Sequence, residues 1–243
     1  MIAQRTLATS GRVLRQLSHD HRTLGLLFVV PPVLITLLKY VFQDDLLFGQ
    51  LAPMLLGIFP LIMMFLVTSI ATLRERRDGT LDRLMAMPMS KLDFIFGYAL
   101  AFSLVALVQA SITSLVMLGW LGVNVVAGTL PVLTCAVAAA FLGTSVGLFT
   151  SAFASTEFQA IQFMPAFIFP QLLTCGLFVA RDSMAQVLQW FADVMPLTYS
   201  VDAMKQVTAH ANWTGQLTRD LVVVVGVGVL ALILGAATIR RQE

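Results

Sequence analysis

Charged residues are scarce in this sequence. Asp, Glu, Lys and Arg make up 12% of the 243 residues, whereas hydrophobic residues make up 58% and the mean hydropathy is +0.87. A soluble domain carries about 25% charged residues, so this composition excludes an ordinary soluble protein. It predicts an integral membrane protein of the all-α class, with room for about six membrane-spanning helices joined by short connections.

Residues that bind metals or perform catalysis are also few. The two cysteines, Cys135 and Cys175, each lie inside an apolar run, which predicts buried side chains and neither a metal site nor a disulfide framework. The ATP-binding pattern G-x-x-x-x-G-K-[ST] is absent, as are H-E-x-x-H and G-x-S-x-G. No expected span has an acidic residue near its middle, which proton-coupled carriers usually require. We therefore expect no enzyme activity, cofactor or metal on this chain, and energy for any transport would come from another subunit.

Long apolar runs predict six spans within a single transmembrane domain over residues 1–243. The spans are expected at residues 24–42, 51–73, 94–120, 130–153, 158–179 and 221–239. Pro31 and Pro32 predict a kink in the first span or a change of direction there. Gly143 and Gly147 lie four residues apart, and small residues at this spacing predict close packing of the fourth span against another helix.

Residues 1–23 have the pattern of a basic amphipathic helix. Its arginines and the lack of an uninterrupted apolar core argue against a signal peptide. On a helical wheel the basic residues share one face, opposite a face of leucine and valine. This pattern predicts a helix in the membrane interface with its arginines near anionic headgroups; the alternative is a helix that binds a soluble partner, and the two roles can coexist. The arginines at the membrane interface would be Arg5, Arg12, Arg15 and Arg22.

Residues 74–93 interrupt the apolar pattern with a dense block of charge, which cannot lie in lipid. Gly79 would end the preceding helix, Thr80 can cap a new one, and Pro88 would close it. The new helix would have an apolar face made by Leu81, Leu84 and Met85. This pattern predicts a short amphipathic helix that docks into a soluble partner; an ordinary solvated loop is the alternative.

Polar residues inside the expected third and fifth spans are candidates for lining an amphipathic substrate route. Pro165 and Pro170 predict a bent, deformable fifth span. The alternative is that these polar residues only pack and hydrogen-bond between helices. The route candidates are Gln109, Gln162, Phe163, Phe167 and Gln171. Glu157, which precedes the fifth span, is the only charge in its connection and would ordinarily be an interfacial residue.

The segment 181–219 is the largest polar stretch outside the spans. Asp182 or Ser183 can cap a short helix, and Pro196 starts a second helix that ends near Thr208. The first helix would carry an apolar stripe of Met184, Val187, Leu188, Phe191 and Val194. Neither helix is long or apolar enough to span, so the pattern predicts surface or re-entrant helices at the outer leaflet.

The distribution of positive charge predicts the orientation. With six spans, eleven of the fifteen Lys and Arg residues lie on one side, including those at both termini and in residues 74–93. The positive-inside rule places that side in the cytoplasm and the segment 181–219 outside.

Three stretches, in the expected order and spread over nearly the whole chain, resemble the type 2 ABC exporter permeases, above all the branch that exports daunorubicin and nodulation factors. The first is E-R-x-x-G-T-L-x-x-L, from Glu75 to Leu84. The second runs from Met195 to Ala203, and the third from Glu157 through Pro165 and Pro170 to Gly176.

The resemblance implies a permease whose charged loop is the coupling helix that sits in a groove of an ABC ATPase subunit. The implied coupling residues are Glu75, Arg76, Gly79, Thr80, Leu81, Arg83, Leu84 and Met85. Glu157 becomes a candidate for communication with the ATPase. ATP and Mg would be bound by that partner chain, and the other partners would be a second permease copy or a homologous permease, together with membrane lipids but no nucleic acid.

The resemblance also implies a function in the cell (inner or plasma) membrane. The expected substrates are amphipathic drugs or lipophilic natural products that are exported from the cell. Two alternatives stay open at this point: export of lipid, glycolipid or polysaccharide by the same type of machine, and a scaffold or sensor that partners an ATPase without transporting anything.

Overall fold

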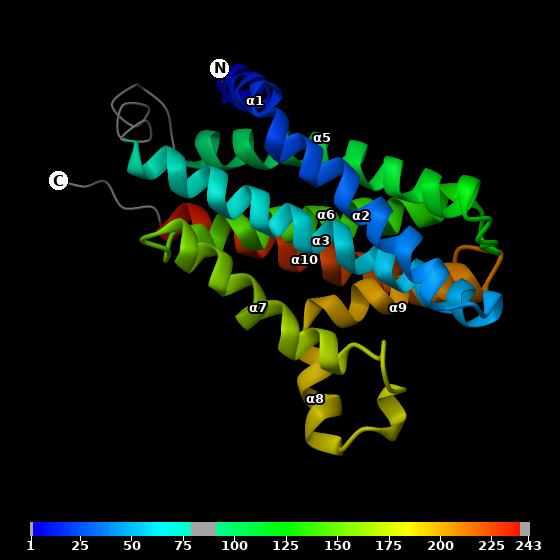
Figure 1. Cartoon of the computed structure of the whole chain (residues 1–243). Coiled ribbons are helices and arrows are strands. Elements are labelled where there is room, and N and C mark those ends of the chain that lie inside the picture. The colour runs from blue at the N-terminus through cyan, green and yellow to red at the C-terminus, as the bar shows by residue number, and fades with distance from the viewer. Residues whose placement is uncertain (1, 79–90, 239–243) are drawn as a thin grey trace.

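The structure is a computed structural model that describes residues 2–78 and 91–238. Its described residues form helices and connecting turns, without a strand (Figure 1). The helices are α1 (Ile2–His19), α2 (His21–Val41), α3 (Asp45–Arg77), α5 (Lys91–Leu115), the π-helical turn η1 (Val116–Trp120), α6 (Thr129–Ser151), α7 (Glu157–Thr174), the 3-10 turn η2 (Arg181–Ser183), α8 (Gln186–Val194), α9 (Pro196–Ala209) and α10 (Gly215–Thr238). The all-α expectation is therefore confirmed for the described part of the chain.

Among the described residues, five helices are long and apolar enough to cross a membrane: α2, α3, α5 continued by η1, α6 and α10. They coincide with five of the six expected spans. The expected fifth span falls on α7, which has 18 residues and is not one of the five. Three glutamines and two prolines lower its apolar character, so a crossing by α7 stays a prediction.

Helices α3 and α6 form the centre of the bundle and touch through glycines. A Cβ atom on Gly143 would lie 2.1 Å from the carbonyl oxygen of Leu61, and one on Gly147 would lie 2.6 Å from that of Phe65. Both distances are too short for a real side chain, so the two backbones are in direct contact. The predicted close approach of α6 to a neighbouring helix is thus confirmed, and the neighbour is α3.

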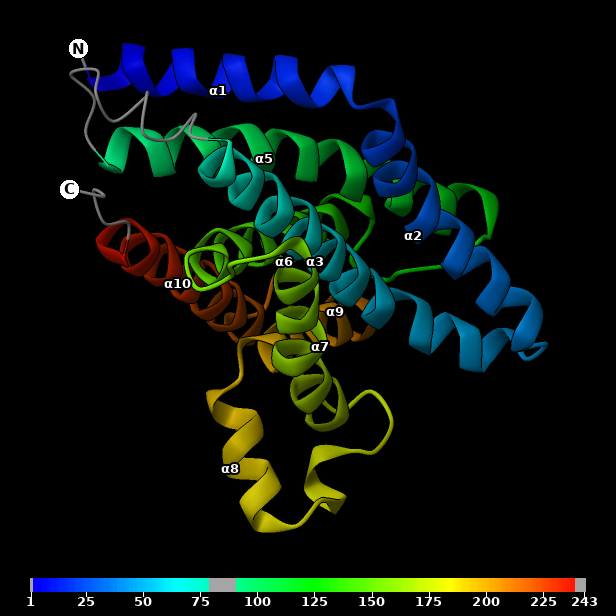
Figure 2. The same cartoon turned by 60° about the vertical axis from the view of Figure 1, so that its left-hand side comes forward.

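The first change of direction in the chain lies between α1 and α2. Figure 1 shows α1 almost end-on while α2 and α3 run across the view, and Figure 2 shows the bend from the side. Asp20 stands at the bend and caps α2 by accepting hydrogen bonds from the backbone N–H (3.1 Å) and hydroxyl (2.6 Å) of Thr23. Helix α2 continues through the buried Pro31 and Pro32, so the bend that was expected at the prolines lies about ten residues earlier.

Helix α7 leaves the bundle and carries η2 and α8 away from it (Figures 1 and 2). We call residues 157–194 the arm. Gly176, with a φ of 82°, ends α7 in a left-handed conformation that favours glycine. The expected cap of α8 was wrong: α8 begins at Gln186 without a side-chain cap, because Asp182 and Ser183 form η2 instead. Helix α9 begins at Pro196, as expected, and it returns to the bundle, where eight of its residues are buried.

Candidate functional site

The last turn of α3 carries four consecutive charged residues, and we call the first three, Arg74, Glu75 and Arg76, the α3 terminus. Neighbouring residues of an α-helix point about 100° apart, so these three side chains leave the helix in different directions. Each of them contacts a different part of the bundle. Shortly after them in the chain come residues 79–90, which hold most of the predicted coupling helix.

Glu75 joins α3 to α1 and α5. Its Oε1 accepts a hydrogen bond from Nη1 of Arg12 at 2.9 Å, and Nη2 of Arg12 donates to the hydroxyl of Tyr98 at 2.7 Å. The side chains of Arg12 and Glu75 are 28% and 11% exposed, and Tyr98 is buried. Burial alone would lower the pKa of Arg12, but its contacts with Tyr98 and Glu75 raise it, so the arginine stays charged.

Arg12 therefore points into the protein, whereas the sequence placed it among the membrane-interface arginines. The wheel grouped it with Arg15 and Arg22, which are exposed. The α1 face that meets α5 includes Thr9 and the buried Val13, and the two backbones approach closely: a Cβ on Gly97 would lie 2.6 Å from Cβ of Thr9. Thr9 and Arg12 are three residues apart and lie on one side of the helix, so the side of α1 that approaches α5 also brings Arg12 to Glu75. The side chain of Arg5 lies outside the described part.

Arg74 joins α3 to the first turn of α7. Its Nε donates to Oε1 of Glu157 at 2.8 Å, and Nη2 donates to Oε2 at 3.1 Å, so the pair is bidentate. The hydrogen bond from Arg74 is the main cause that lowers the pKa of Glu157 below its usual range. The carboxylate also sits at a helix N-terminus, where negative charge is favourable. Thr156 caps the same helix by accepting from Gln159 N–H at 3.1 Å.

Arg76 joins α3 to the end of α6. Its Nη1 donates to the carbonyl oxygen of Ala152 at 2.8 Å, and Nη2 donates to that of Ala154. These carbonyls follow the last turn of α6, where backbone acceptors have no intrahelical partner. The α3 terminus thus holds α1, α5, α6 and α7 together at one end of the bundle.

We expect the Arg74–Glu157 pair to contribute little to stability. Both side chains are substantially exposed, at 53% and 41%, and pairs of this kind contribute about 0.2–1 kcal/mol. Glu157→Gln should therefore lower the free energy of unfolding by less than about 1 kcal/mol, and less at high salt. Thermal unfolding in detergent at two salt concentrations measures this, with the exposed Asp182→Asn as the matched control.

The pH dependence of this pair follows from the sign of the shift. Because the pKa of Glu157 is lowered in the folded state, the pair stabilises above the ordinary glutamate pKa of about 4.3 and is lost as the pH falls through the lowered value. The difference between wild type and Glu157→Gln should then be constant from about pH 6 to 8. A difference that changes across this range would contradict the assignment.

The residues expected to line a substrate route do not converge on one path in this chain. Gln109 is fully buried in α5, and neither amide atom has a hydrogen-bond partner among the described residues. Gln171 is buried and used structurally: Nε2 donates to the Phe167 carbonyl at 2.9 Å, and Oε1 accepts from Leu197 N–H at 3.2 Å. Gln162 alone of the five is exposed.

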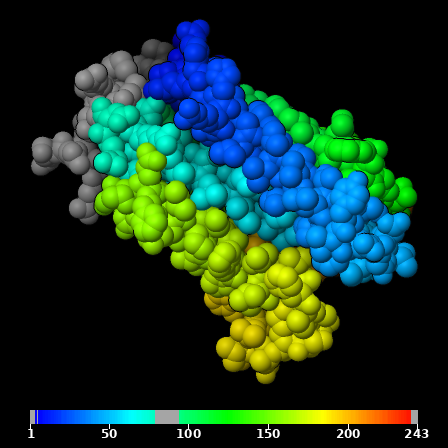
Figure 3. All heavy atoms as spheres, in the orientation of Figure 1, coloured from blue at the N-terminus to red at the C-terminus, as the bar shows by residue number. Residues whose placement is uncertain are grey.

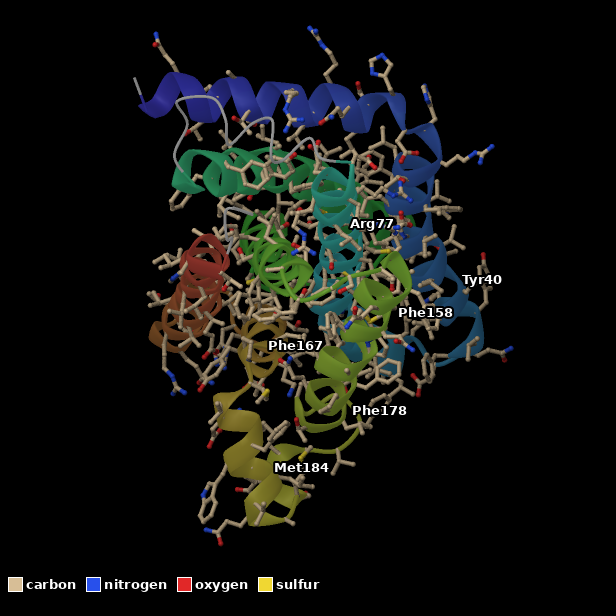
Figure 4. All side chains as sticks on the ribbon, turned by 90° about the vertical axis from the view of Figure 1, so that its left-hand side faces the viewer. Tyr40, Arg77, Phe158, Phe167, Phe178 and Met184 are labelled. Atoms are coloured by element: carbon tan, nitrogen blue, oxygen red, sulfur yellow. The ribbon has the colours of Figure 1, made fainter. Side chains whose placement is uncertain are left out.

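The two phenylalanines of that group lie toward the bundle. Phe163 and Phe167 are half-buried, and the ring of Phe167 stacks on Phe65 of α3 with centroids 6.2 Å apart. Figure 4 shows Phe167 and Phe158 on opposite sides of α7, and Phe158 is 69% exposed. The outer side of α7 therefore carries the residues that are accessible to a substrate or a partner.

Six of the predicted coupling residues lie outside the described residues: Gly79, Thr80, Leu81, Arg83, Leu84 and Met85. The two that are described, Glu75 and Arg76, both belong to the α3 terminus. Sequence reasoning missed their partners Tyr98, Ala152 and Ala154, because nothing in a single sequence marks which helices meet. The only available signal was that Tyr98 is a polar aromatic residue near the charged end of an expected span.

A second network lies at the base of α8. Arg181 donates from Nη1 to Oδ2 of Asp202 at 2.7 Å and from Nη2 to Oδ1 of Asp193. Lys205 donates to the other oxygen of Asp202 at 3.3 Å. The network joins the arm to α9, and no local pattern in the sequence predicts that these charges pair.

Comparison with known proteins places the chain among membrane transport proteins. A family model described as "ABC-2 type transporter" matches residues 5–208. The chain is 30% identical to ABC transporter G family member 20 of Dictyostelium discoideum over 141 residues, which are 58% of this chain and 19% of that protein. It is 29% identical to the probable multidrug ABC transporter permease YbhR of Escherichia coli (strain K12) over 156 residues, 64% of this chain and 42% of YbhR.

The inner membrane transport permease YhhJ of Escherichia coli (strain K12) is similar to the same degree. It is 29% identical over 142 residues, which are 58% of this chain and 38% of YhhJ. The matched segments thus span less than half the length of each of these relatives.

Proposed function

Because this chain belongs to the ABC-2 type transporter family, we propose that it is the membrane-spanning permease subunit of an ATP-driven exporter whose ATPase is a separate chain. The observation that carries the proposal is the α3 terminus, which directly precedes the predicted coupling helix and is bonded to four other helices. ATP and Mg would be bound by the partner, and this chain would perform no catalysis.

Movement of the coupling helix would reach the bundle through three sets of contacts. The Arg12–Glu75 pair would carry it to α1 and, through Tyr98, to α5. The Arg76 contacts would carry it to the end of α6, and the Arg74–Glu157 pair to the start of α7. This arrangement supports the role proposed for Glu157 in communication with the ATPase, because its partner is only five residues from Gly79.

The proposed orientation puts the α3 terminus in the cytoplasm of the cell, in the inner or plasma membrane. The positive charges of residues 1–22 and 74–77 support this placement under the positive-inside rule. The start of α1 and the end of α10 lie at the same end of the bundle as the α3 terminus (Figure 1), so both termini would be cytoplasmic.

The proposed substrates are amphipathic drugs or lipophilic natural products, moved outward between two permease copies. The name of YbhR, a probable multidrug permease, supports this class. So does the outer side of α7, where the amide of Gln162 is surrounded by exposed aromatic and aliphatic side chains such as Phe158 and Phe169. Accumulation of fluorescent cationic drugs in cells with and without the chain tests the substrate class, and unchanged accumulation of all of them would count against it.

The first test of the proposal is co-purification in mild detergent. When the chain is expressed with its genomic neighbours, an ATPase subunit should co-purify with it. The rate of ATP hydrolysis by that subunit should depend on the presence of this chain. Isolation of the chain without any nucleotide-binding partner under all conditions tried would overturn the coupling role.

Leu84→Asp should abolish ATPase association. A carboxylate on the predicted apolar face of the coupling helix would have to be buried without a partner in the groove, which is strongly unfavourable. Co-purification should fall at least about tenfold, corresponding to a loss of about 1.4 kcal/mol of binding free energy. The matched control is Leu84→Met, which keeps the apolar face. Normal association of the Leu84→Asp chain would show that the docking surface lies elsewhere.

A further inference from the structure

Asp220 is the only charged residue that is buried among those whose side chains the structure describes. The sequence predicts the last span over residues 221–239, which places Asp220 in the outer connection, but α10 begins at Gly215 and holds Asp220 in its second turn. The side chain is 2% exposed and shares the buried face of α10 with Leu217 and Val224. A carboxyl group therefore lies inside a membrane-spanning helix, where ionisable residues are costly and mark functional sites.

The Asp220 carboxyl has no counter-charge of its own. Its Oδ2 atom is buried, and no hydrogen-bond donor among the described residues reaches it. The cations that act on it electrostatically are Arg219 and Arg181, and both are engaged elsewhere. The guanidinium of Arg219 lies 5.7 Å from the ring centre of Tyr199, and Arg181 is bound by two carboxylates of the network at the base of α8.

The helices packed against α10 at this point do not supply a counter-charge either. Helix α6 presents Cys135, a thiol in an apolar cluster. Helix α9 presents Asp202, which already accepts from Lys205 and whose negative charge would repel a second one at Asp220. An ionised Asp220 would thus be buried without a partner and repelled by a like charge, and both effects are unfavourable. The neutral acid avoids both.

The position of Asp220 connects it to the arm. Helix α10 begins at the end of the bundle opposite the α3 terminus (Figure 1), and we call this the outer end. Asp202, which acts on Asp220 from α9, also binds Arg181 of the arm. Figure 3 shows that α2, α3 and the arm cover one side of the bundle and leave little of α9 and α10 visible. Because Asp220 is so deeply buried, water reaches it only when the helices around it separate.

We propose that Asp220 is a proton-binding site whose occupancy depends on the packing of α6, α9 and α10. In the arrangement described here the carboxyl holds a proton. When the three helices separate at the outer end, water enters, the O–H bond breaks, the proton passes to water and the carboxylate becomes solvated. This release step rests on the proposed function, because an exporter opens its outer end in each cycle. Acid on the outer side then favours the closed packing.

Thermal unfolding in detergent between about pH 5 and 8 tests the proton site. Asp220→Asn keeps the shape of the side chain and cannot ionise; Asp182→Asn is the control, because Asp182 is exposed. Throughout this range Asp220 is ionised in the unfolded chain, since a free aspartate titrates near pH 4, whereas the folded wild type holds the proton or buries a charge. Raising the pH should therefore favour unfolding of the wild type relative to Asp220→Asn.

The ratio of the two unfolding equilibrium constants should change by about tenfold over this range, since one proton contributes at most about tenfold per pH unit. The Asp182→Asn chain should follow the wild type. The same pH dependence in the wild type and Asp220→Asn overturns the proposal.

Infrared spectroscopy of the purified wild type decides the question if Asp220→Asn does not fold. A protonated carboxyl absorbs apart from the carboxylates. At about pH 5.5, where exposed Asp and Glu side chains are ionised, the spectrum should show about one protonated carboxyl among the thirteen Asp and Glu residues of the chain. A spectrum with carboxylate bands alone overturns the proposal.

ATP hydrolysis by the co-purified complex in sealed vesicles tests the release step. ATP added outside drives only complexes whose outer end faces the vesicle interior. Acidifying the interior should slow hydrolysis by the wild type about twofold or more, because protonation of Asp220 favours the closed packing, and should slow Asp220→Asn less. An equal effect on both chains overturns the release step. A chain that binds no ATPase overturns the proposed function instead, while the unfolding and infrared results still decide whether Asp220 binds a proton.

Discussion

Gly143→Val is expected to prevent normal assembly of the bundle. The added side chain would begin 2.1 Å from the carbonyl oxygen of Leu61, which is backbone and cannot rotate away. Helices α3 and α6 would have to separate, and every contact along their central interface would loosen. Overpacking of this kind costs about 1–3 kcal/mol and more where the backbone cannot adjust, so we expect a loss of at least about 3 kcal/mol.

The measurement is thermal unfolding of the purified chain in detergent, together with its yield as a monodisperse species. Gly226→Val is the matched control, because a Cβ at Gly226 of α10 would meet no atom within 4 Å. Gly147→Ala should give an intermediate loss, since its Cβ would lie 2.6 Å from the carbonyl oxygen of Phe65. Equal stability of the Gly143→Val and Gly226→Val chains would show that α3 and α6 do not touch as described.

Glu75→Ala is expected to destabilise the charged end of the bundle and, under the proposed function, to uncouple the ATPase from the permease. Without the carboxylate, the guanidinium of Arg12 stays largely buried beside Tyr98 with no opposite charge. Leaving a buried charge unpaired costs several kcal/mol; because Arg12 is 28% exposed, we expect about 2–3 kcal/mol. The contact that ties α3 to α1 and α5 is lost at the same time.

A double-mutant cycle measures the pair itself. Arg12→Ala, Glu75→Ala and the double variant are compared by unfolding in detergent and by ATPase turnover of the reconstituted complex. The double variant should be more stable than Glu75→Ala alone, because it removes the unpaired charge. Arg22→Ala, which removes an exposed arginine at the start of α2, is the control and should change neither measurement by much. Additive effects of the two single substitutions would mean that Arg12 and Glu75 do not interact.

The helix contact at Gly143 and the ion pair of Glu75 differ in how much of each can be predicted from the sequence. The spacing of Gly143 and Gly147 already predicts a close helix contact, because a missing side chain permits backbone approach whichever helix arrives. Only the structure identifies that helix as α3, because the partner lies about eighty residues away in the chain. The charge of Glu75 likewise marked a water-exposed end of a span. Glu75 pairs with Arg12, which lies 63 residues away in the chain, and Arg12 pairs with Tyr98, which lies 86 residues from Arg12; no local pattern encodes either pairing.

By itself, the sequence determined the membrane class, five spans that are long and apolar enough to cross, the amphipathic helices α1 and α8, and the family. These depend on composition and on periodicity within one segment, which need no knowledge of neighbours. Only the tertiary structure decided that Arg12 points inward and that the apolar stripe of α8 faces outward. It also showed that the side chain of Gln171 accepts a hydrogen bond from the Leu197 N–H, and so has a structural role. An amphipathic pattern gives a helix two faces, but which face is covered depends on the helices that pack against it, and those come from distant parts of the chain.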